Sequence, residues 1–331
     1  MILAGIALTL CALWYFENKR RRTHSVQAGL QGDTELPHEQ EFELYHNALS
    51  LCSMKSRLCL AELEIPYKSH PVDLIETGCY ENIRSPFLRV NPAGTVPVLV
   101  HNGHPIYESH EQIRYAAEHV PVSSPTLVPH SPLLREEMEY WIDRSSIIGD
   151  PINHESESAG NAVPGQTFPL FITMIERISF WKILEGLLFH FDKRRPLMFL
   201  AFKLLGLNVL RKSRPLSAIF TQSRAQMHNH FDALEAKLQQ TGGPWILGDT
   251  FSLADVSWLA IYERLRQLNA LHVFAGREER PACAQYWDNL EMRPSYQEAI
   301  RAHSHPIVVH GTQRLCDAKA GSPALRELLE G

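Results

Sequence analysis

The residues best suited to chemistry in this chain lie in one short turn, residues 44–55. Ser50, Cys52 and Ser53 follow a strand-like run that ends at His46, and apolar residues then recur three and four apart, which indicates a helix. The N-terminus of a helix presents unpaired N–H groups and a partial positive charge, so it favours anions, including thiolates. The turn therefore predicts a thiol-handling site. The structural alternative is that Ser50 only caps the helix and Cys52 is a small buried side chain.

An α/β arrangement is expected to position this turn. The pattern predicts a strand, a helix and a second strand, followed by a two-stranded hairpin turned at Asn102-Gly103. The predicted ranges are 42–46, 53–63, 67–74, 98–100 and 105–107. Ser109 and Gln112 then form a capping box that opens a helix to about residue 119.

Val96-Pro97 stands at the head of the hairpin. A proline there suits an edge or a special bend, because it donates no ladder hydrogen bond. The bond between Val96 and Pro97 is a candidate for the cis form, and the sequence leaves cis and trans open.

Beyond a connection with four prolines, residues 121–132, the remaining patterns are helical. Helices are predicted at 133–148, 217–240 and 253–268, with a loop at 150–167. Ser252 and Asp255 form a second capping box at the start of the last of these helices, which is expected to be buried and to hold the helical part together.

A strongly apolar stretch with basic ends, residues 168–210, offers two interpretations. Its helices can pack on the domain or on a partner subunit, which we favour, or they can lie on an anionic membrane. A second transmembrane span is not expected, because Glu176, Arg177 and Lys182 interrupt the run.

The N-terminus predicts a membrane anchor. Residues 2–16 are almost unbroken in their apolar character, and Lys19, Arg20, Arg21 and Arg22 follow. As a helix this run rises about 22 Å, less than the roughly 30 Å hydrocarbon core, so an interfacial segment or a signal peptide is the alternative. The basic cluster predicts a single-pass anchor with the rest of the chain in the cytoplasm. Residues 23–40 are polar and predict a linker.

Composition limits the remaining possibilities. The 331 residues carry a formal net charge of −5, which gives no global reason to expect nucleic acid as a partner. The six cysteines show no C-x-x-C pair and are typical of reduced thiols in a reducing compartment. The seventeen histidines show no spacing of metal ligands, so no metal is expected.

The order of these motifs resembles the cytosolic glutathione S-transferase superfamily over about residues 41–305. The resemblance implies an α/β plus all-α fold, with a thioredoxin-like domain that binds glutathione and a C-terminal helical domain. With the anchor added, the expected organisation is an anchor and basic flank at 1–22, a linker at 23–40, a thioredoxin-like domain at 41–120, a helical domain at 131–305 with an insertion near 160–215, and a tail at 306–331.

The resemblance also implies roles for five residues. Ser50 would donate a hydrogen bond to the glutathione sulfur and favour its thiolate. Val96, before Pro97 as a cis proline, would pair through its main chain with the cysteinyl part. Glu108 and Ser109 would bind the ammonium and carboxylate of the γ-glutamyl part. Thr95 departs from the longer polar residue common in the family.

Two branches with a Ser-x-Cys site are the most similar, the zeta class and tetrachlorohydroquinone reductive dehalogenase. The analogy implies that Cys52, acidified by the helix N-terminus and Lys55, attacks the sulfur of a glutathionyl adduct in reductive dehalogenation, or serves isomerisation. The expected function is a glutathione-dependent transferase acting on a small electrophile, with a homodimer left open. The alternative is a catalytically weak, membrane-anchored interaction or sensing module, as in the similar ganglioside-induced differentiation-associated branch.

Overall fold

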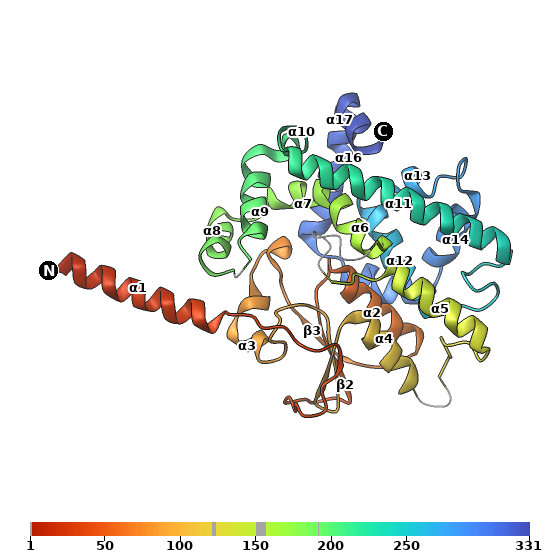
Figure 1. Ribbon diagram of the computed structural model, residues 1–331, viewed down its shortest axis with the longest axis horizontal. Coiled ribbons are helices and arrows are strands. Elements are labelled where there is room, and N and C mark those ends of the chain that lie inside the picture. The colour runs from red at the N-terminus through yellow and green to blue at the C-terminus, as the bar shows by residue number, and fades with distance from the viewer. Residues whose placement is uncertain (1, 121–123, 150–156, 191) are drawn as a thin grey trace.

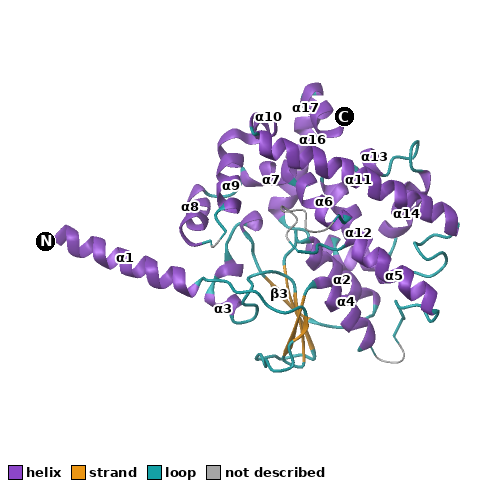
Figure 2. Ribbon diagram, in the orientation of Figure 1, coloured by secondary structure: helices purple, strands orange, loops and turns teal. Residues whose placement is uncertain are grey.

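The computed structural model describes residues 2–120, 124–149, 157–190 and 192–331, and it combines a small sheet with a large helical body (Figure 1). Colouring by secondary structure shows the strands gathered on one side of the molecule and helices everywhere else (Figure 2). The sequence prediction of an α/β part followed by an all-α part is therefore confirmed.

The sheet has five strands in the order β1-β5-β4-β2-β3, in which β2 and β3 are parallel and the other neighbours antiparallel. The strands are β1 (Gly29–Leu30), β2 (Phe42–His46), β3 (Lys68–Pro71), β4 (Val98–His101) and β5 (His104–Tyr107). The helices of this domain are α2 (Leu51–Glu62), α3 (Ser85–Leu88) and α4 (Ser109–Glu118), with single 3₁₀ turns at Ile75–Thr77 and Glu81–Ile83. The thioredoxin-like prediction, with its βαβ unit and hairpin, is confirmed.

Alternation along the strands separates the two faces of the sheet. Leu44, Leu99 and Ile106 are cross-strand neighbours and join the main core on the side of α2 and α4. The side chains that alternate with them, Val98 and Tyr107 among others, form a second, smaller cluster on the opposite face. The three central strands β2, β4 and β5 are mostly buried on both faces, whereas β1 and β3 at the two edges are partly exposed.

The segment predicted as a linker, residues 23–40, is bound to the sheet. β1 pairs with β5, the N–H of His24 donates to Pro92 O at 2.9 Å, and that of Leu36 donates to Gly103 O at 2.7 Å. The side chain of Leu36 is buried in the smaller cluster. The prediction that residues 23–40 form a linker was wrong, because β1 pairs with β5. Without β1, β5 would be an edge strand with unpaired main-chain groups.

The helical body is centred on α12 (Leu253–Gln267), which is buried along almost its whole length. The predicted capping box is present, and the buried Asp255 carboxylate also accepts from Ile246 N at 3.0 Å and Tyr286 OH at 2.8 Å. Burial raises the pKa of Asp255 to about 6, although these hydrogen bonds oppose the shift. Around α12 lie α5 (Pro132–Ser145), α6 (Ala159–Gln166), α11 (Arg214–Thr241), α13 (Leu271–Phe274), α14 (Pro281–Glu291) and α15 (Pro294–Ala299), with a 3₁₀ turn at Arg301–His303.

The insertion is helical and mostly packed. Its elements are α7 (Phe168–Ile175), α8 (Phe180–Phe189), α9 (Arg194–Leu205), a 3₁₀ turn at Gly206–Asn208 and α10 (Val209–Lys212). α7 is almost entirely buried, as the packing interpretation predicts, whereas α8 buries only Ile183 and Gly186. The predicted loop at 150–167 was partly wrong, since α6 begins at Ala159; residues 150–156 lie outside the described residues.

Residues 306–331, predicted as a tail, form α16 (Pro306–Gly321) and α17 (Pro323–Glu330). α16 packs closely on α7, where Thr173 Oγ1 donates to Gly311 O at 2.8 Å. A Cβ at Gly311 would lie 2.4 Å from Met174 Cγ, so only glycine allows this approach. The C-terminal segment is thus part of the helical body.

The N-terminal segment forms α1 (Ile2–Arg20), which projects away from the rest of the molecule (Figure 1). None of the helices that the structure describes, α1 included, is both long and apolar enough to cross a membrane. The predicted transmembrane anchor is therefore corrected to an exposed helix. α1 continues to Arg20, but its apolar run ends at Phe16 and its last turn is charged from Glu17 onward. The apolar part of the helix is therefore shorter than the helix itself.

Candidate functional site

The sheet register brings three predicted parts of the site to one edge. Tyr45, near the end of β2, pairs with Val98 at the start of β4, and Leu99 pairs with Ile106 near the end of β5. The turn after β2, the residues before β4 and the residues after β5 therefore all lie at the same end of the sheet. These are the segments that contain Ser50, Val96 and Glu108.

Ser50 is the N-cap of α2, as predicted. Its Oγ accepts a hydrogen bond from Ser53 N at 3.2 Å, and its extended backbone leaves the helix at that point. A serine hydroxyl that accepts in this way still has its own hydrogen to donate. Ser50 can therefore cap the helix and donate to an anion at the helix N-terminus at the same time.

Asn47, which carried no predicted role, holds this turn in place. Its Oδ1 accepts from Leu49 N at 2.9 Å and Ser50 N at 3.3 Å, while its Nδ2 donates to Val72 O and Thr77 Oγ1, both at 2.9 Å. All of these are made by a buried side chain. An asparagine between a strand and a helix cap is the signal that could have identified this role.

Two buried arginines also hold the carbonyls of the turn. Arg57 Nη1 donates to Asn47 O at 3.0 Å, and Arg264 Nη2 donates to Leu49 O. Within the described residues, Arg57 Nη2 and the Nε and Nη1 of Arg264 have no hydrogen-bond partner. Burial lowers the pKa of each guanidinium to about 10. Because Arg264 lies on α12, the helical body reaches directly into the turn.

The Val96-Pro97 bond is cis, and the main chain beside it is available. Within the part of the chain that the structure describes, neither the N–H nor the C=O of Val96 has a backbone partner. Gln112 braces this segment from α4, because its Nε2 donates to Pro97 O at 3.0 Å and to Ile106 O at 2.9 Å. Val96 can therefore accept and donate to an extended peptide laid beside it.

Glu108 and Ser109 mark the N-terminus of α4. Glu108 has φ 64° and ψ 123°, a conformation that L side chains rarely adopt and that is typical of ligand-binding positions. Its side chain is exposed, whereas Ser109 is buried at the first position of the helix. The pair thus presents a carboxylate and a helix N-terminus at the same place.

Cys52 lies inside this cluster, near the Ser109 hydroxyl. Burial raises the pKa of the Cys52 thiol, and the Glu108 carboxylate adds to the increase, while the Lys55 charge and the Ser109 contact oppose it. The prediction that Cys52 is more acidic than a free thiol was wrong for the protein without a ligand. Desolvation of the thiolate outweighs the single nearby cation.

Lys55 is the cation next to Cys52, and it connects the two domains. Its Nζ donates to Ser146 Oγ, just after α5, at 2.8 Å, and Ser146 Oγ donates onward to Ile142 O at 2.7 Å. Burial lowers the pKa of Lys55 to about 8. From the sequence, Lys55 was predicted only as a neighbour of Cys52, because its partner Ser146 on the second domain is remote in sequence.

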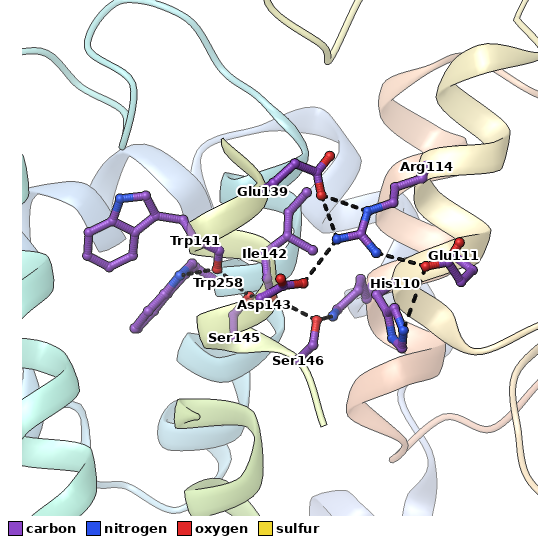
Figure 3. Close-up of polar contacts among 11 residues, drawn as sticks. His110, Glu111, Arg114, Glu139, Trp141, Ile142, Asp143, Ser145, Ser146 and Trp258 are labelled. Atoms are coloured by element: carbon purple, nitrogen blue, oxygen red, sulfur yellow. Dashed lines mark hydrogen bonds and ion pairs between the residues drawn. The ribbon is translucent and has the colours of Figure 1, made fainter. Parts of the chain in front are cut away.

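Arg114 makes a second connection between the domains. From α4 it donates to Glu139 Oε2 at 2.7 Å and to Asp143 Oδ1 at 3.0 Å, both on α5 (Figure 3). It also donates to Glu111 Oε1 at 2.9 Å on its own helix. Figure 3 shows Ser146 close to this group, so the helix that carries Glu108 and Ser109 is fixed against the helical domain.

The two histidines near the turn do not form a catalytic base with Cys52. His46 is buried, where its Nε2 meets Ser69 Oγ at 2.8 Å and its Nδ1 meets Arg57 Nη1 at 3.0 Å. Burial and the charge of Arg57 lower the pKa of His46 to about 3. Burial and Lys55 lower the pKa of His110 as well. His46 is therefore part of the support behind the turn.

Comparisons with known proteins agree with this arrangement. The family model for the glutathione S-transferase N-terminal domain matches residues 49–119, and the model for the C-terminal domain matches residues 217–288. The chain is 24% identical over 261 residues to tetrachloro-p-hydroquinone reductive dehalogenase of Sphingobium chlorophenolicum, covering 78% of this chain and 95% of that protein. It is 27% identical over 258 residues to glutathione S-transferase TCHQD of Arabidopsis thaliana, covering 78% of this chain and 89% of that protein.

Among solved structures, the beta-etherase LigF of Sphingobium sp. strain SYK-6 is similar with a TM-score of 0.64 at 20% identity, covering 80% of this chain and all of that one. Glutathione transferase F7 of Populus trichocarpa is similar with a TM-score of 0.55 at 22% identity, covering 80% of this chain and 99% of that one. These likenesses concern the fold. The two glutathione S-transferase domain models therefore match this chain in their order along the sequence, and the two relatives align with it over most of their own length.

Proposed function

We propose that this protein is a glutathione-dependent transferase that acts on a small electrophile. The observation that carries the proposal is the convergence of three features at one end of the sheet: the serine-capped N-terminus of α2, the Val96 main chain and the Glu108–Ser109 start of α4. Among the described residues, the Val96 main chain has no backbone partner. A tripeptide with a thiol, a peptide backbone and an α-amino acid end has one group for each of these features. Its bound form would be extended, like an added strand.

In this proposal each residue meets the group that its chemistry suits. The Ser50 hydroxyl donates to the glutathione sulfur and stabilises the thiolate without taking its proton. Val96 pairs with the cysteinyl backbone beside Pro97. The Glu108 carboxylate binds the γ-glutamyl ammonium, and Ser109 with the N-terminus of α4 binds the γ-glutamyl carboxylate.

The reaction begins with attack of the glutathione thiolate on an electrophilic carbon, which forms a thioether and expels a leaving group such as halide. For reductive removal, the Cys52 thiolate then attacks the sulfur of that thioether. The carbon–sulfur bond breaks, the carbon takes the electron pair and a proton, and a Cys52–glutathione disulfide forms. A second glutathione thiolate releases glutathione disulfide and restores Cys52. Similarity to the reductive dehalogenase supports this second stage.

A catalytically weak interaction or sensing module is the second candidate. The raised pKa of Cys52 favours it, because a protonated thiol is a poor nucleophile.

The test measures glutathione binding and turnover on the full chain with a panel that includes a halogenated hydroquinone and a maleyl compound. We expect Ser50→Ala to lower kcat/KM by about 10²-fold or more while the fold is kept, as for removal of one anion-stabilising donor. Ser131→Ala, at the N-cap of α5, is the matched control and should leave activity unchanged.

Cys52→Ser separates the two stages. If Cys52 resolves an adduct, the variant still consumes the first glutathione but accumulates the glutathionyl product, which mass spectrometry detects. Cys316→Ser on α16 should behave as the wild type. Absence of both glutathione binding and turnover in the wild-type protein would contradict the enzyme proposal and leave the interaction module.

A further inference from the structure

A cavity of about 480 Å³ lies where the end of α1 meets the junction of α8 and α9, and its lining includes none of the residues assigned to the glutathione site. Aromatic rings and cations line it together; the lining includes Trp14, Tyr15, Lys19, Arg22, Phe189 and Lys193. None of the proposed glutathione chemistry uses these residues. A hollow with aromatic walls and several positive charges suits an anionic group attached to an apolar body.

The positive charge of this cavity is only partly neutralised by its neighbours. Arg21 pairs with Glu17 at 2.6 Å and with Glu185 of α8 at 2.7 Å, and Glu17 also pairs with Arg20. Over the described ranges Lys19, Arg22 and Lys193 enter no ion pair. Three cations therefore remain for a ligand that brings negative charge.

Arg21 fixes the base of α1 to the body. Besides its ion pair to Glu185, its guanidinium lies over the Phe189 ring at 4.7 Å from the centroid. The cavity is therefore a feature of the folded molecule, with one wall from α1 and the other from the insertion.

Along α1 the residue types change in a fixed order. No residue of the helix is buried, and its first part is apolar on all sides. Trp14, Tyr15 and Phe16 follow, all exposed, and the basic residues come last. Hydrocarbon, aromatic and basic residues in this order match the depth profile of a bilayer from its interior to its headgroups.

The neighbouring helix offers further exposed apolar groups. Phe180, Trp181 and Leu188 of α8 are exposed, with Trp181 at 74%. They belong to the helix that contributes Phe189 to the cavity, and exposed large apolar side chains of this kind are typical of a membrane contact.

We propose that the cavity between α1 and the α8–α9 junction binds the phosphate headgroup of an anionic phospholipid, while the apolar part of α1 enters the same leaflet without crossing the bilayer. Lys19, Arg22 and Lys193 contact the phosphate and neighbouring headgroups. Trp14 and Tyr15 lie at the level of the ester groups. The apolar part of α1, about 22 Å long, exceeds the roughly 15 Å half-thickness of the hydrocarbon core, so the helix enters at a tilt.

The experiment measures co-sedimentation of the full chain with vesicles of phosphatidylcholine alone or with 30% phosphatidylserine. We expect strong binding to the anionic vesicles, weaker binding to the neutral ones and loss of the difference at high salt. The triple variant Lys19→Gln, Arg22→Gln, Lys193→Gln should bind anionic vesicles about a hundredfold more weakly, from about fivefold for each charge near the surface. The matched control changes the same number of exposed cations elsewhere: Lys212→Gln, Arg214→Gln and Arg326→Gln.

A second measurement locates the contact. Phosphatidylcholine brominated near the headgroup, mixed into the anionic vesicles, should quench part of the tryptophan fluorescence. Trp14→Phe should reduce the quenched part, and the quenching that remains should come from the exposed Trp181 of α8. Equal weakening by both triple variants would overturn the proposal in favour of general charge attraction. Binding of inorganic phosphate without vesicle binding would overturn it in favour of a soluble phosphate site, and self-association of the chain without vesicle binding in favour of a contact between copies. Glutathione binding, measured in parallel, reports on the other site independently.

Discussion

At the scale of single residues, burial and the charge of Lys55 shift the pKa of Cys52 in opposite directions. Cys52 has a cation beside it, yet burial raises its pKa. Lys55 is buried itself, and its pKa is lowered to about 8. Each group makes the other's charged form more favourable, so ionised Cys52 and charged Lys55 stabilise one another. A bound anion at the helix N-terminus would change both.

Lys55 gives a prediction about stability and pH. Its pKa is 10.5 when exposed and about 8 in the fold, so below pH 8 both states are protonated and the folded state carries the full cost of the buried charge. Between pH 8 and 10.5 the unfolded state binds the extra proton, and the stability of the wild type rises by up to about 3 kcal/mol. Lys55→Met lacks this titration. The free energy of unfolding of Lys55→Met minus that of the wild type should therefore decrease as the pH rises through this window.

Urea unfolding at several pH values measures this change. Lys212→Met, at an exposed lysine, should follow the wild type throughout. Parallel stability curves for wild type and Lys55→Met would show that Lys55 is not a buried charge. The same samples can be alkylated, and loss of the nearby cation should move the labelling of Cys52 to higher pH.

At the scale of elements, the site depends on helix starts and strand ends. Ser50 begins α2, Glu108 and Ser109 begin α4, and Val96 precedes β4. All three segments lie at one end of the sheet because of its register. The segment at 23–40 completes this domain from the opposite side, since β1 covers the edge of β5.

The packing of residues 23–40 predicts unequal effects of two leucines. Leu36 is 9% exposed within the smaller core cluster, whereas Leu30 is 47% exposed on β1. Leu36→Ala should lower the free energy of unfolding by about 2 kcal/mol, the lower end for buried leucines, because it leaves a cavity. Leu30→Ala should change it by less than about 0.5 kcal/mol. Chemical denaturation measures both changes. Two small and equal changes would show that residues 23–40 are a linker that does not pack on the sheet.

At the scale of the whole molecule, the two domains meet through a few polar contacts close to the site. Lys55 donates to Ser146, Arg264 donates to Leu49, and Arg114 joins α4 to α5. Two of these contacts end on the turn or the helix that carries Ser50. We infer that domain packing and the geometry of the thiol site are coupled.

Arg114 and Glu139 allow a measurement of that coupling. The pair joins the domains at 2.7 Å but is partly exposed, so a double-mutant cycle with Arg114→Met and Glu139→Gln should give about 0.5–1 kcal/mol, decreasing with salt. Arg114→Met should also weaken glutathione binding a few-fold, because α4 carries Glu108 and Ser109. The Arg277–Asp288 pair lies within the helical body, and breaking it should leave glutathione binding unchanged. If the cycle gives no coupling energy between Arg114 and Glu139 and Arg114→Met does not change glutathione binding, domain packing does not influence the glutathione site.

The sequence by itself determined the features that depend on neighbours along the chain. Helix caps at Ser50 and Ser252, the strand pattern with its hairpin, and the position of Val96-Pro97 are all read from spacing within a few residues. Local hydrogen bonds and alternation of burial create these patterns, so the fold and the composition of the candidate site could be predicted.

Tertiary structure decided the features that depend on remote partners. The two-residue strand β1 is too short to have a pattern of its own and exists because β5 offers an edge. Arg57 and Arg264 support the turn through contacts that no local spacing indicates. The raised pKa of Cys52 was mispredicted for the same reason, since burial comes from the packed assembly of both domains, whereas the helix start and Lys55 lie next to it in the sequence.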